Sequence, residues 1–447
     1  MKMFLCSFLN VFHMVYEIVA GRTSVEKEKW GLTGTVFLGK QYVQMEKVMS
    51  LASPIYLDVS KPHILLISGK RGSGKSYSMG VLAEGIVGLP REIATSLSCL
   101  IFDTMGIFWT MKYPNYRDDA LLREWGLSPR SLTPVIFCPH GLFTDYQEKG
   151  VPVDVPFALK PLEISADSWC DMFKLELISG EGILIERALE ATREKYGDFD
   201  IDQIVEQAKA DNRATDREKA VVENRFLAAK KWGLFKKEGT AITDLFRGGV
   251  TTILDLSAYA QVEGGDRIKA LIIGLVSRKI LEQRMAARKA EEIKLISEGG
   301  YLMEAEAVAL AEEKAPLVWI MIDEAHEFIP RTGKTLASHA LIELLREGRQ
   351  PGISLVLATQ QPGKIHTDVM TQADIVLSHR VTAKIDIDAL NEIAATYLPH
   401  TLQKYIDELP PAKGTAILLD DKLEKIYPMR VRPRFSWHGG EDPAAIR

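Results

Sequence analysis

The sequence has few cysteines, no long apolar run and no excess of positive charge. Its 447 residues include four scattered cysteines, Cys6, Cys99, Cys138 and Cys170, without a C-x-x-C pair. Neither a disulfide framework nor a zinc knuckle is indicated, and a reducing, cytoplasmic setting is expected. No segment reaches the roughly 20 uninterrupted apolar residues of a membrane span. Because the formal net charge is -5, any contact with DNA has to come from a local basic patch.

The first 20 residues are rich in Phe, Leu, Val and Met and resemble a signal peptide only superficially. Asn10, His13 and Glu17 interrupt the apolar run, one lysine precedes it, and no small-residue cleavage site follows. We expect this segment to form a buried first strand or helix.

Short β-rich runs alternate with longer helical patterns through most of the chain. This alternation predicts an α/β fold with a largely parallel sheet. With 46% apolar and 26% charged residues, the composition is that of a globular protein, and no internal repeat is visible. The predicted strands are Ile64–Ser68, Cys99–Phe102, Val250–Leu254, Leu317–Ile322, Ile353–Ala358, Asp374–His379 and Thr415–Leu419.

The periodicity changes to helical, with dense Glu, Lys and Arg, between Glu163 and Arg247. We interpret this range as a helical subdomain inserted into the sheet domain. A long charged helix is predicted after it, from Asp266 to about Ile296, with a solvated face. The expected units are a short β-rich region at 1–60, the sheet domain at 61–162 and 248–430, the helical insert at 163–247, and a tail at 431–447.

The strongest motif is the phosphate-binding loop Gly69-Lys70-Arg71-Gly72-Ser73-Gly74-Lys75-Ser76, which follows a predicted strand and opens a predicted helix. Glycines let backbone N–H groups close around phosphates, and the helix amino end adds a partial positive charge. Lys75 is predicted to neutralise the β and γ phosphates of ATP, and Ser76 to ligate Mg²⁺. The predicted nucleotide-binding residues are Gly69, Arg71, Gly72, Ser73, Gly74, Lys75, Ser76 and Tyr77.

A second motif is the apolar strand Leu317–Ile322, which ends in the adjacent carboxylates Asp323 and Glu324. Asp323 suits the magnesium shell, and Glu324 suits a base that orients the attacking water. The alternative is that both are surface acids after a core strand. His326, two residues later, is expected to be structural.

The third motif is the strand Ile353–Ala358, which runs into Thr359 and Gln360. The Gln360 amide can donate to the γ phosphate or accept from the lytic water. The alternative is that Gln360 caps a helix or turn.

Together these motifs resemble the HerA branch of the FtsK/HerA translocases. The segment Leu344-Leu345-Arg346-Glu347-Gly348-Arg349 and the tail Val431-Arg432-Pro433-Arg434-Phe435-Ser436-Trp437-His438-Gly439-Gly440 add to the resemblance. It covers roughly Lys61 to Gly440, although the insert matches only in being helical. The resemblance implies a RecA-like P-loop NTPase core, a homohexameric ring, ATP-driven movement along duplex DNA in a central pore, and a NurA-type nuclease partner.

The chain departs from this family at its amino end, where about 60 residues stand in place of a larger β-barrel. The barrel is where a nuclease would dock, so the partner is left open. The alternative is a HerA-like ring scaffold that assembles and activates an effector enzyme in antiviral defence, with ATP turnover as its regulator. A metabolic P-loop kinase fits less well, because a kinase excludes water from transfer whereas Asp323 and Glu324 fit water activation.

A ring would bring two further sets of residues into use. Arg346 and Arg349 lie one turn apart on a helical run, and an arginine that crosses to the neighbouring subunit would stabilise charge on its γ phosphate. We favour Arg349, which is nearer to Gln360. The alternative for both arginines is a surface ion pair with Glu343 or Glu347.

Contact with DNA is expected from loops that face the pore. The segment after the strand ending at Asp103 mixes Trp109 and Tyr113 with basic residues, and a second basic loop follows Glu324. Such loops can serve backbone phosphates and exposed bases, although ordinary surface loops have the same composition. The predicted DNA contacts are Lys112, Arg117, Arg331 and Lys334.

Overall fold

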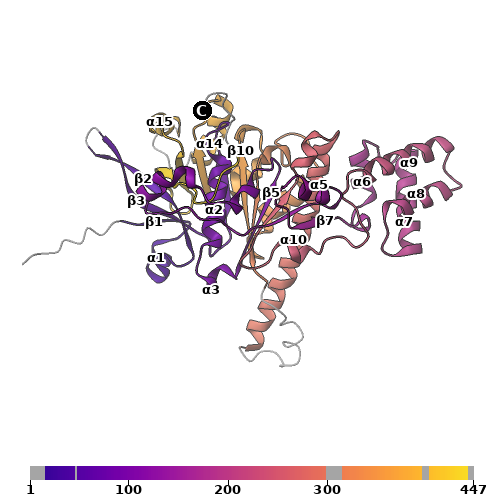
Figure 1. Cartoon of the computed structure of the whole chain (residues 1–447), viewed down its shortest axis with the longest axis horizontal. Helices are drawn as coiled ribbons and strands as arrows, with labels where there is room; N and C mark the ends of the chain where they lie inside the picture. Colours follow the sequence, from indigo (N-terminus) through magenta and orange to yellow (C-terminus); the bar gives the residue numbers. More distant parts are fainter. Residues whose placement is uncertain (1–15, 46–47, 299–314, 395–401, 441–447) are drawn as a thin grey trace, which may run out of the picture.

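The computed structural model describes residues 16–45, 48–298, 315–394 and 402–440. The described residues form one sheet with helices on both faces (Figure 1). Cys6 and the first 15 residues lie outside this range. The strands are β1 Ile18–Ala20, β2 Thr35–Met45, β3 Val48–Asp58, β4 Ile64–Ser68, β5 Leu97–Asp103, β6 Val135–Pro139, β7 Val155–Phe157, β8 Thr251–Asp255, β9 Leu317–Ile322, β10 Ile353–Thr359, β11 Ile375–His379, β12 Thr415–Asp420 and β13 Lys425–Val431.

The strand order is β1-β3-β2-β13-β12-β11-β4-β10-β9-β5-β8-β6-β7. All pairs from β11 to β7 are parallel, whereas β12, β13 and β2 join by antiparallel pairs. The predicted α/β class is therefore confirmed. The range 1–60, which we expected as a reduced barrel, contributes β1, β2 and β3 to this same sheet through β13.

The helices are α1 Ser24–Trp30, α2 Lys75–Val87, α3 Arg91–Ala94, α4 Asp119–Glu124, α5 Phe143–Glu148, α6 Ala166–Phe173, α7 Gly180–Tyr196, α8 Ile201–Ala210, α9 Asp216–Lys230, α10 Gly265–Glu298, α12 Ser338–Glu347, α13 Thr367–Gln372, α14 Lys384–Ala394 and α15 Leu402–Asp407. Helices α7, α8 and α9 pack on one another beside the sheet, within the range predicted as the insert (Figure 1). The far end of α10 projects from the body.

Strand β4 shows why the middle of the sheet is buried. Successive strand residues point to opposite faces, so Ile64 and Leu66 enter one apolar core while Leu65 and Ile67 enter the other. Helix α12 supplies side chains to the first core, and α2 supplies side chains to the second. Parallel strands that are covered on both faces read as continuous apolar runs, and they leave only their ends to carry chemistry.

Candidate nucleotide-binding site

The phosphate-binding loop leaves the carboxyl end of β4, between the buried neighbours β10 and β11. Gly69 has φ 156° and Gly74 has φ 114°. A Cβ on Gly69 would lie 2.3 Å from Ser73 Oγ and 2.7 Å from His379 Cβ, so only glycine fits there. Because α2 begins at Lys75, its unpaired N–H groups open into the loop, which makes a phosphate cradle.

The side chains of this loop are suited to bind an anion. Lys75 is buried, and its Nζ makes only a long contact of 3.5 Å to the carbonyl of Lys70. Ser73 Oγ is buried without a hydrogen-bond partner in the described residues. Arg71 and Gly72 lie exposed at the rim of the loop. A buried ammonium group and a buried, unsatisfied hydroxyl group are each costly unless a ligand supplies their partners.

Ser76 and Asp323 are brought together from α2 and from the end of β9. Ser76 Oγ donates to Asp323 Oδ2 at 2.5 Å, and Asp323 is buried. Burial raises the pKa of Asp323, while the Ser76 and Glu324 donors and Lys75 oppose this shift. Mg²⁺ prefers such hard oxygen atoms and commonly takes one or two of them plus phosphate oxygens. No group of three or more metal-binding side chains occurs in the described residues, so a cation held here would share its shell with a nucleotide.

Glu324 occupies a strained and unsatisfied position. Its backbone is left-handed, with φ 51° and ψ 42°, which costs a residue with a Cβ about 1–3 kcal/mol. Its Oε2 is buried without a hydrogen-bond partner in the described part of the chain. Burial, and next the Asp323 charge, raise the pKa of Glu324 to about 7. A carboxyl group that titrates near neutrality suits a general base.

Gln360 follows β10 and lies next to Glu324, whose carboxyl group accepts a hydrogen bond from the Gln360 backbone N–H. His326 also contacts this region: its Nδ1 lies 3.1 Å from Thr359 Oγ1 and 3.6 Å from Glu324 Oε2. Burial lowers the pKa of His326, so the ring is neutral. It links the ends of β9 and β10, which is a positioning role.

Sequence reasoning missed His379, which lies fully buried against the phosphate-binding loop. Its Nε2 is 2.9 Å from Ser78 Oγ on α2, and its Nδ1 is 3.0 Å from the Thr415 carbonyl. Burial lowers the pKa of His379 to about 4, so the ring stays neutral and packs against the loop. No local motif marks it, because its partners are distant in sequence.

Arg349, the favoured finger arginine, lies at the opposite edge of the sheet. Arg349 Nη2 is 3.3 Å from Asp374 Oδ1, which also accepts from the backbone N–H of Ile64 at the amino end of β4. At roughly 3.3 Å per residue, the five-residue β4 separates Arg349 from the loop by about 16 Å. Arg349 therefore does not reach its own loop. Arg346 pairs with Asp368 at 2.7 Å, so neither arginine uses Glu343 or Glu347.

The four predicted DNA contacts fall into two groups. Lys112 Nζ lies 2.7 Å from both carboxylate oxygens of Asp154, in a partly exposed ion pair. Arg117 lies over the Trp437 ring at 5.0 Å. Arg331 and Lys334 are exposed, and they share with Arg346 the lining of a hollow of about 390 Å³.

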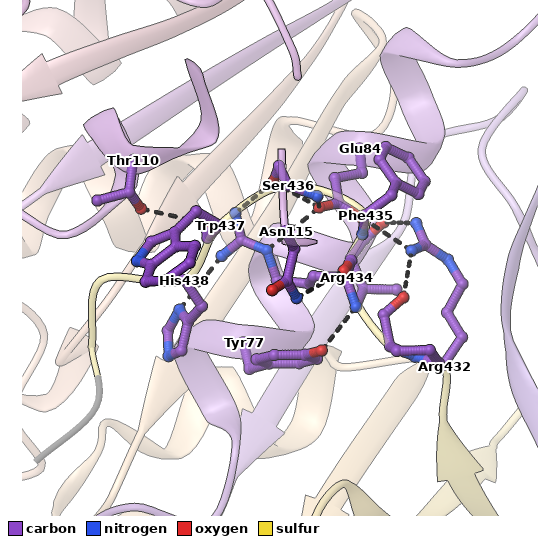
Figure 2. A network of polar contacts seen from close by, with 12 residues as sticks. Tyr77, Glu84, Thr110, Asn115, Arg432, Arg434, Phe435, Ser436, Trp437 and His438 are labelled. Atoms are coloured by element: carbon purple, nitrogen blue, oxygen red, sulfur yellow. Dashed lines mark hydrogen bonds and ion pairs between the residues drawn. The ribbon is translucent and has the colours of Figure 1, made fainter. Parts of the chain in front are cut away.

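Tyr77 contacts a C-terminal segment, a contact that the phosphate-binding motif does not predict. Residues 432–438, here called the C-terminal clasp, cross α2 (Figure 2). The Arg434 N–H donates to Tyr77 Oη at 2.6 Å. Arg432 and Arg434 both bond the fully buried Glu84, at 2.8 and 3.2 Å. A Cβ on Gly80 would lie 2.5 Å from the Arg434 guanidinium, so this helix glycine gives the clasp its room.

Comparisons with known proteins agree with this geometry. Residues 37–280 match the family model of the helicase HerA central domain, and residues 250–397 match the zonular occludens toxin (Zot) model. The DNA double-strand break repair helicase HerA of Pyrococcus furiosus is 26% identical over 43% of this chain and 36% of that protein. The HerA of Sulfurisphaera tokodaii is 21% identical over 69% of this chain and 53% of that protein. The chain therefore spans about a third to a half of these relatives.

Among solved structures, VirB4 of Thermoanaerobacter pseudethanolicus has the same fold. It superposes with a TM-score of 0.55 at 12% identity, over 90% of this chain and 97% of VirB4.

None of the described helices has the length and hydrophobicity of a membrane span. Since the central-domain model covers more than half of the sequence, the chain belongs to the family of the helicase HerA central domain.

Proposed function

We propose that this protein is a ring-forming motor that hydrolyses ATP to move along duplex DNA. The observation that carries the proposal is the meeting of three groups at one edge of the sheet. The phosphate-binding loop, the Ser76–Asp323 pair and the strained Glu324 all lie where β4 and β9 end. Ligands of open α/β sheets bind at this edge.

Each group has a distinct part in hydrolysis. The loop and Lys75 hold the phosphates, and Ser76 and Asp323 would hold Mg²⁺, which neutralises charge on the β and γ oxygens when bound. Glu324 accepts a proton from the attacking water or polarises it, and Gln360 orients that water or the γ phosphate. A water-activating base also argues against the kinase alternative.

The position of Arg349 favours a ring. Because Arg349 lies at the amino edge and half-exposed, it serves a nucleotide only if that nucleotide belongs to a neighbouring copy. We propose Arg349 as the finger acting across the interface, with Arg346 as the second candidate. Such fingers contribute about 10³–10⁵ in rate.

Mixed rings test this arrangement. Lys75→Ala and Arg349→Ala subunits should each be inactive alone, and mixing them should restore part of the ATP hydrolysis. An intact arginine of the first variant can then meet an intact site of the second. Mixtures that stay inactive at every ratio, or a fully active Arg349→Ala protein, would remove Arg349 from the mechanism.

The DNA part of the proposal draws on the curated relatives, which are named as helicases of DNA double-strand break repair. We propose Arg117, Arg331 and Lys334 as the contacts in a central pore, since all three follow strands at the edge that carries the nucleotide site. Their charges would bind backbone phosphates. A NurA-like nuclease, or a defence effector, is the proposed partner.

DNA-stimulated hydrolysis separates the motor from the scaffold alternative. The purified protein should hydrolyse ATP with Mg²⁺, and duplex DNA should raise the rate. Neutralising Arg331 and Lys334 together should reduce the stimulation and the salt dependence of DNA binding, while basal hydrolysis remains. A hexamer with hydrolysis that is indifferent to DNA would favour the scaffold, and an ATP-indifferent monomer would contradict both.

A further inference from the structure

The C-terminal clasp ends beside the nucleotide site. Tyr77 directly follows Ser76 on α2, and the His438 ring lies edge-on to the Tyr77 ring, with centroids 5.2 Å apart and planes at 81°. Trp437 and His438 adjoin at the end of the clasp, both half-buried (Figure 2). An aromatic group therefore borders the first turn of the phosphate-binding helix.

The direction expected for the phosphates of ATP would place this group on the nucleoside side. Asp323 and Glu324 mark the γ-phosphate end, and Lys75 reaches the β and γ phosphates. Tyr77 follows Ser76 on α2, so in that orientation Tyr77 would lie nearer to the α phosphate and the nucleoside. The side chains around Tyr77 are the ones that a nucleoside would meet there.

The clasp holds its aromatic end in place from two sides. On the side of α2, Glu84 binds both clasp arginines and also accepts from the backbone N–H and hydroxyl of Ser436, at 3.0 and 2.6 Å. On the other side, the Trp437 N–H donates to the Tyr113 carbonyl at 2.7 Å, and Thr110 Oγ1 donates to the Trp437 carbonyl at 3.1 Å. A surface fixed in this way binds a flat ligand without losing further conformational entropy.

We propose that Tyr77 and His438, beside the Trp437 ring over which Arg117 lies, form the subsite for the purine base of the bound nucleotide. The proposal rests on the nucleotide binding proposed above. Aromatic faces stack on nucleic-acid bases with little dependence on sequence. The clasp is then the part of the chain that selects a nucleotide over a bare polyphosphate.

His438 also has the hydrogen-bonding state that a base needs. Its Nδ1 is 3.3 Å from Arg434 Nη1 and accepts from that guanidinium, which can only donate. Burial, and next Arg434 and Arg117, lower the pKa of His438 to about 3, so the ring is neutral at pH 7. The single ring proton is then on Nε2, which is ready to donate to a ring nitrogen of a purine.

Competition between ATP and inorganic tripolyphosphate, each with Mg²⁺, tests the subsite. His438→Ala should weaken ATP binding about tenfold by loss of the aromatic contact and leave tripolyphosphate binding unchanged. His438→Phe should keep most of the ATP affinity, since it keeps the ring. If His438→Ala left the ratio of the ATP and tripolyphosphate affinities unchanged, including by an equal loss of both, the proposal would be overturned.

Photolabelling of the wild-type protein with 8-azido-ATP tests the subsite without any variant. We expect the label on the peptide with Trp437 and His438 or on Tyr77, and a label confined to other peptides would overturn the subsite. Lys75→Ala should lose both ATP and tripolyphosphate. Wild-type protein that binds both equally tightly would overturn only the base subsite, whereas binding of neither would overturn the proposed function as well.

Discussion

Two glutamates, the buried Glu84 on α2 and the partly buried Glu324 after β9, have opposite surroundings. Glu84 is inaccessible to solvent, and both of its oxygens accept hydrogen bonds from the clasp. Glu324 has a left-handed backbone, an Oε2 without a hydrogen-bond partner in the described residues, and a pKa raised to about 7. A folded chain keeps such strain and unpaired polarity only where another requirement maintains it. The comparison indicates that Glu84 holds structure, and it supports the proposal of Glu324 as the base.

The largest expected effect is on the rate of ATP hydrolysis when Glu324 is replaced. Glu324→Gln should lower ATP hydrolysis about 10²–10⁴-fold, because an amide cannot accept the proton, while nucleotide binding survives. Wild-type kcat/KM should fall about tenfold per pH unit below pH 7, because protonation removes the carboxylate base. The variant should lack this acidic limb.

Glu327→Gln is the matched control for that experiment. Glu327 lies three residues away, and its partner Lys269 is 3.7 Å distant. This variant should keep the wild-type rate, and its acidic limb should move to slightly lower pH, because the Glu327 charge contributes to the raised pKa of Glu324. Hydrolysis by Glu324→Gln at the wild-type rate would show that Glu324 is not the base.

A smaller effect sharpens the comparison at Glu84. Glu84→Gln leaves two buried guanidinium groups without a counter-charge, which should lower the free energy of unfolding by about 3–5 kcal/mol. Chemical denaturation measures this loss. Hydrogen exchange should show greater opening in residues 432–438 than in β4.

Glu26→Gln provides a surface pair of the same form. Glu26 also binds two cations, Lys61 and Lys422, but it and its partners are partly exposed. Its loss should cost at most about 1 kcal/mol. Equal effects of the two substitutions would show that burial of the Glu84 cluster does not set its contribution.

Local motifs were predictable because their residues are close in sequence. A strand, a glycine-rich turn and a helix start within 13 residues at Ile64–Ser76, so spacing alone indicated the loop. The same holds for Asp323 and Glu324 after β9. Strands β6, β7 and β13 are not among the predicted strands, and each contains a proline, Pro139, Pro156 or Pro428, which usually argues against a strand.

The contacts of single side chains were much less predictable. Arg349 was expected near Glu343 or Glu347 or in a neighbouring site, and the fold pairs it with Asp374. The composition of the loop around Lys112 predicts a DNA contact, yet in the fold Lys112 forms an ion pair with Asp154. Composition shows which residues carry charge, whereas only the folded chain shows which charges are already paired.

The sequence by itself determined the α/β class, the phosphate-binding loop and the two acids at the end of β9, since hydrophobic periodicity and motif spacing act over a few residues. Tertiary structure alone decided that the clasp closes over the nucleotide helix. Arg432 and Glu84 are 348 positions apart. Their pairing depends on β13 lying between β12 and β2 in the sheet, which brings the end of the chain back to α2. No short-range pattern encodes that return, because it follows from the order in which distant strands pair.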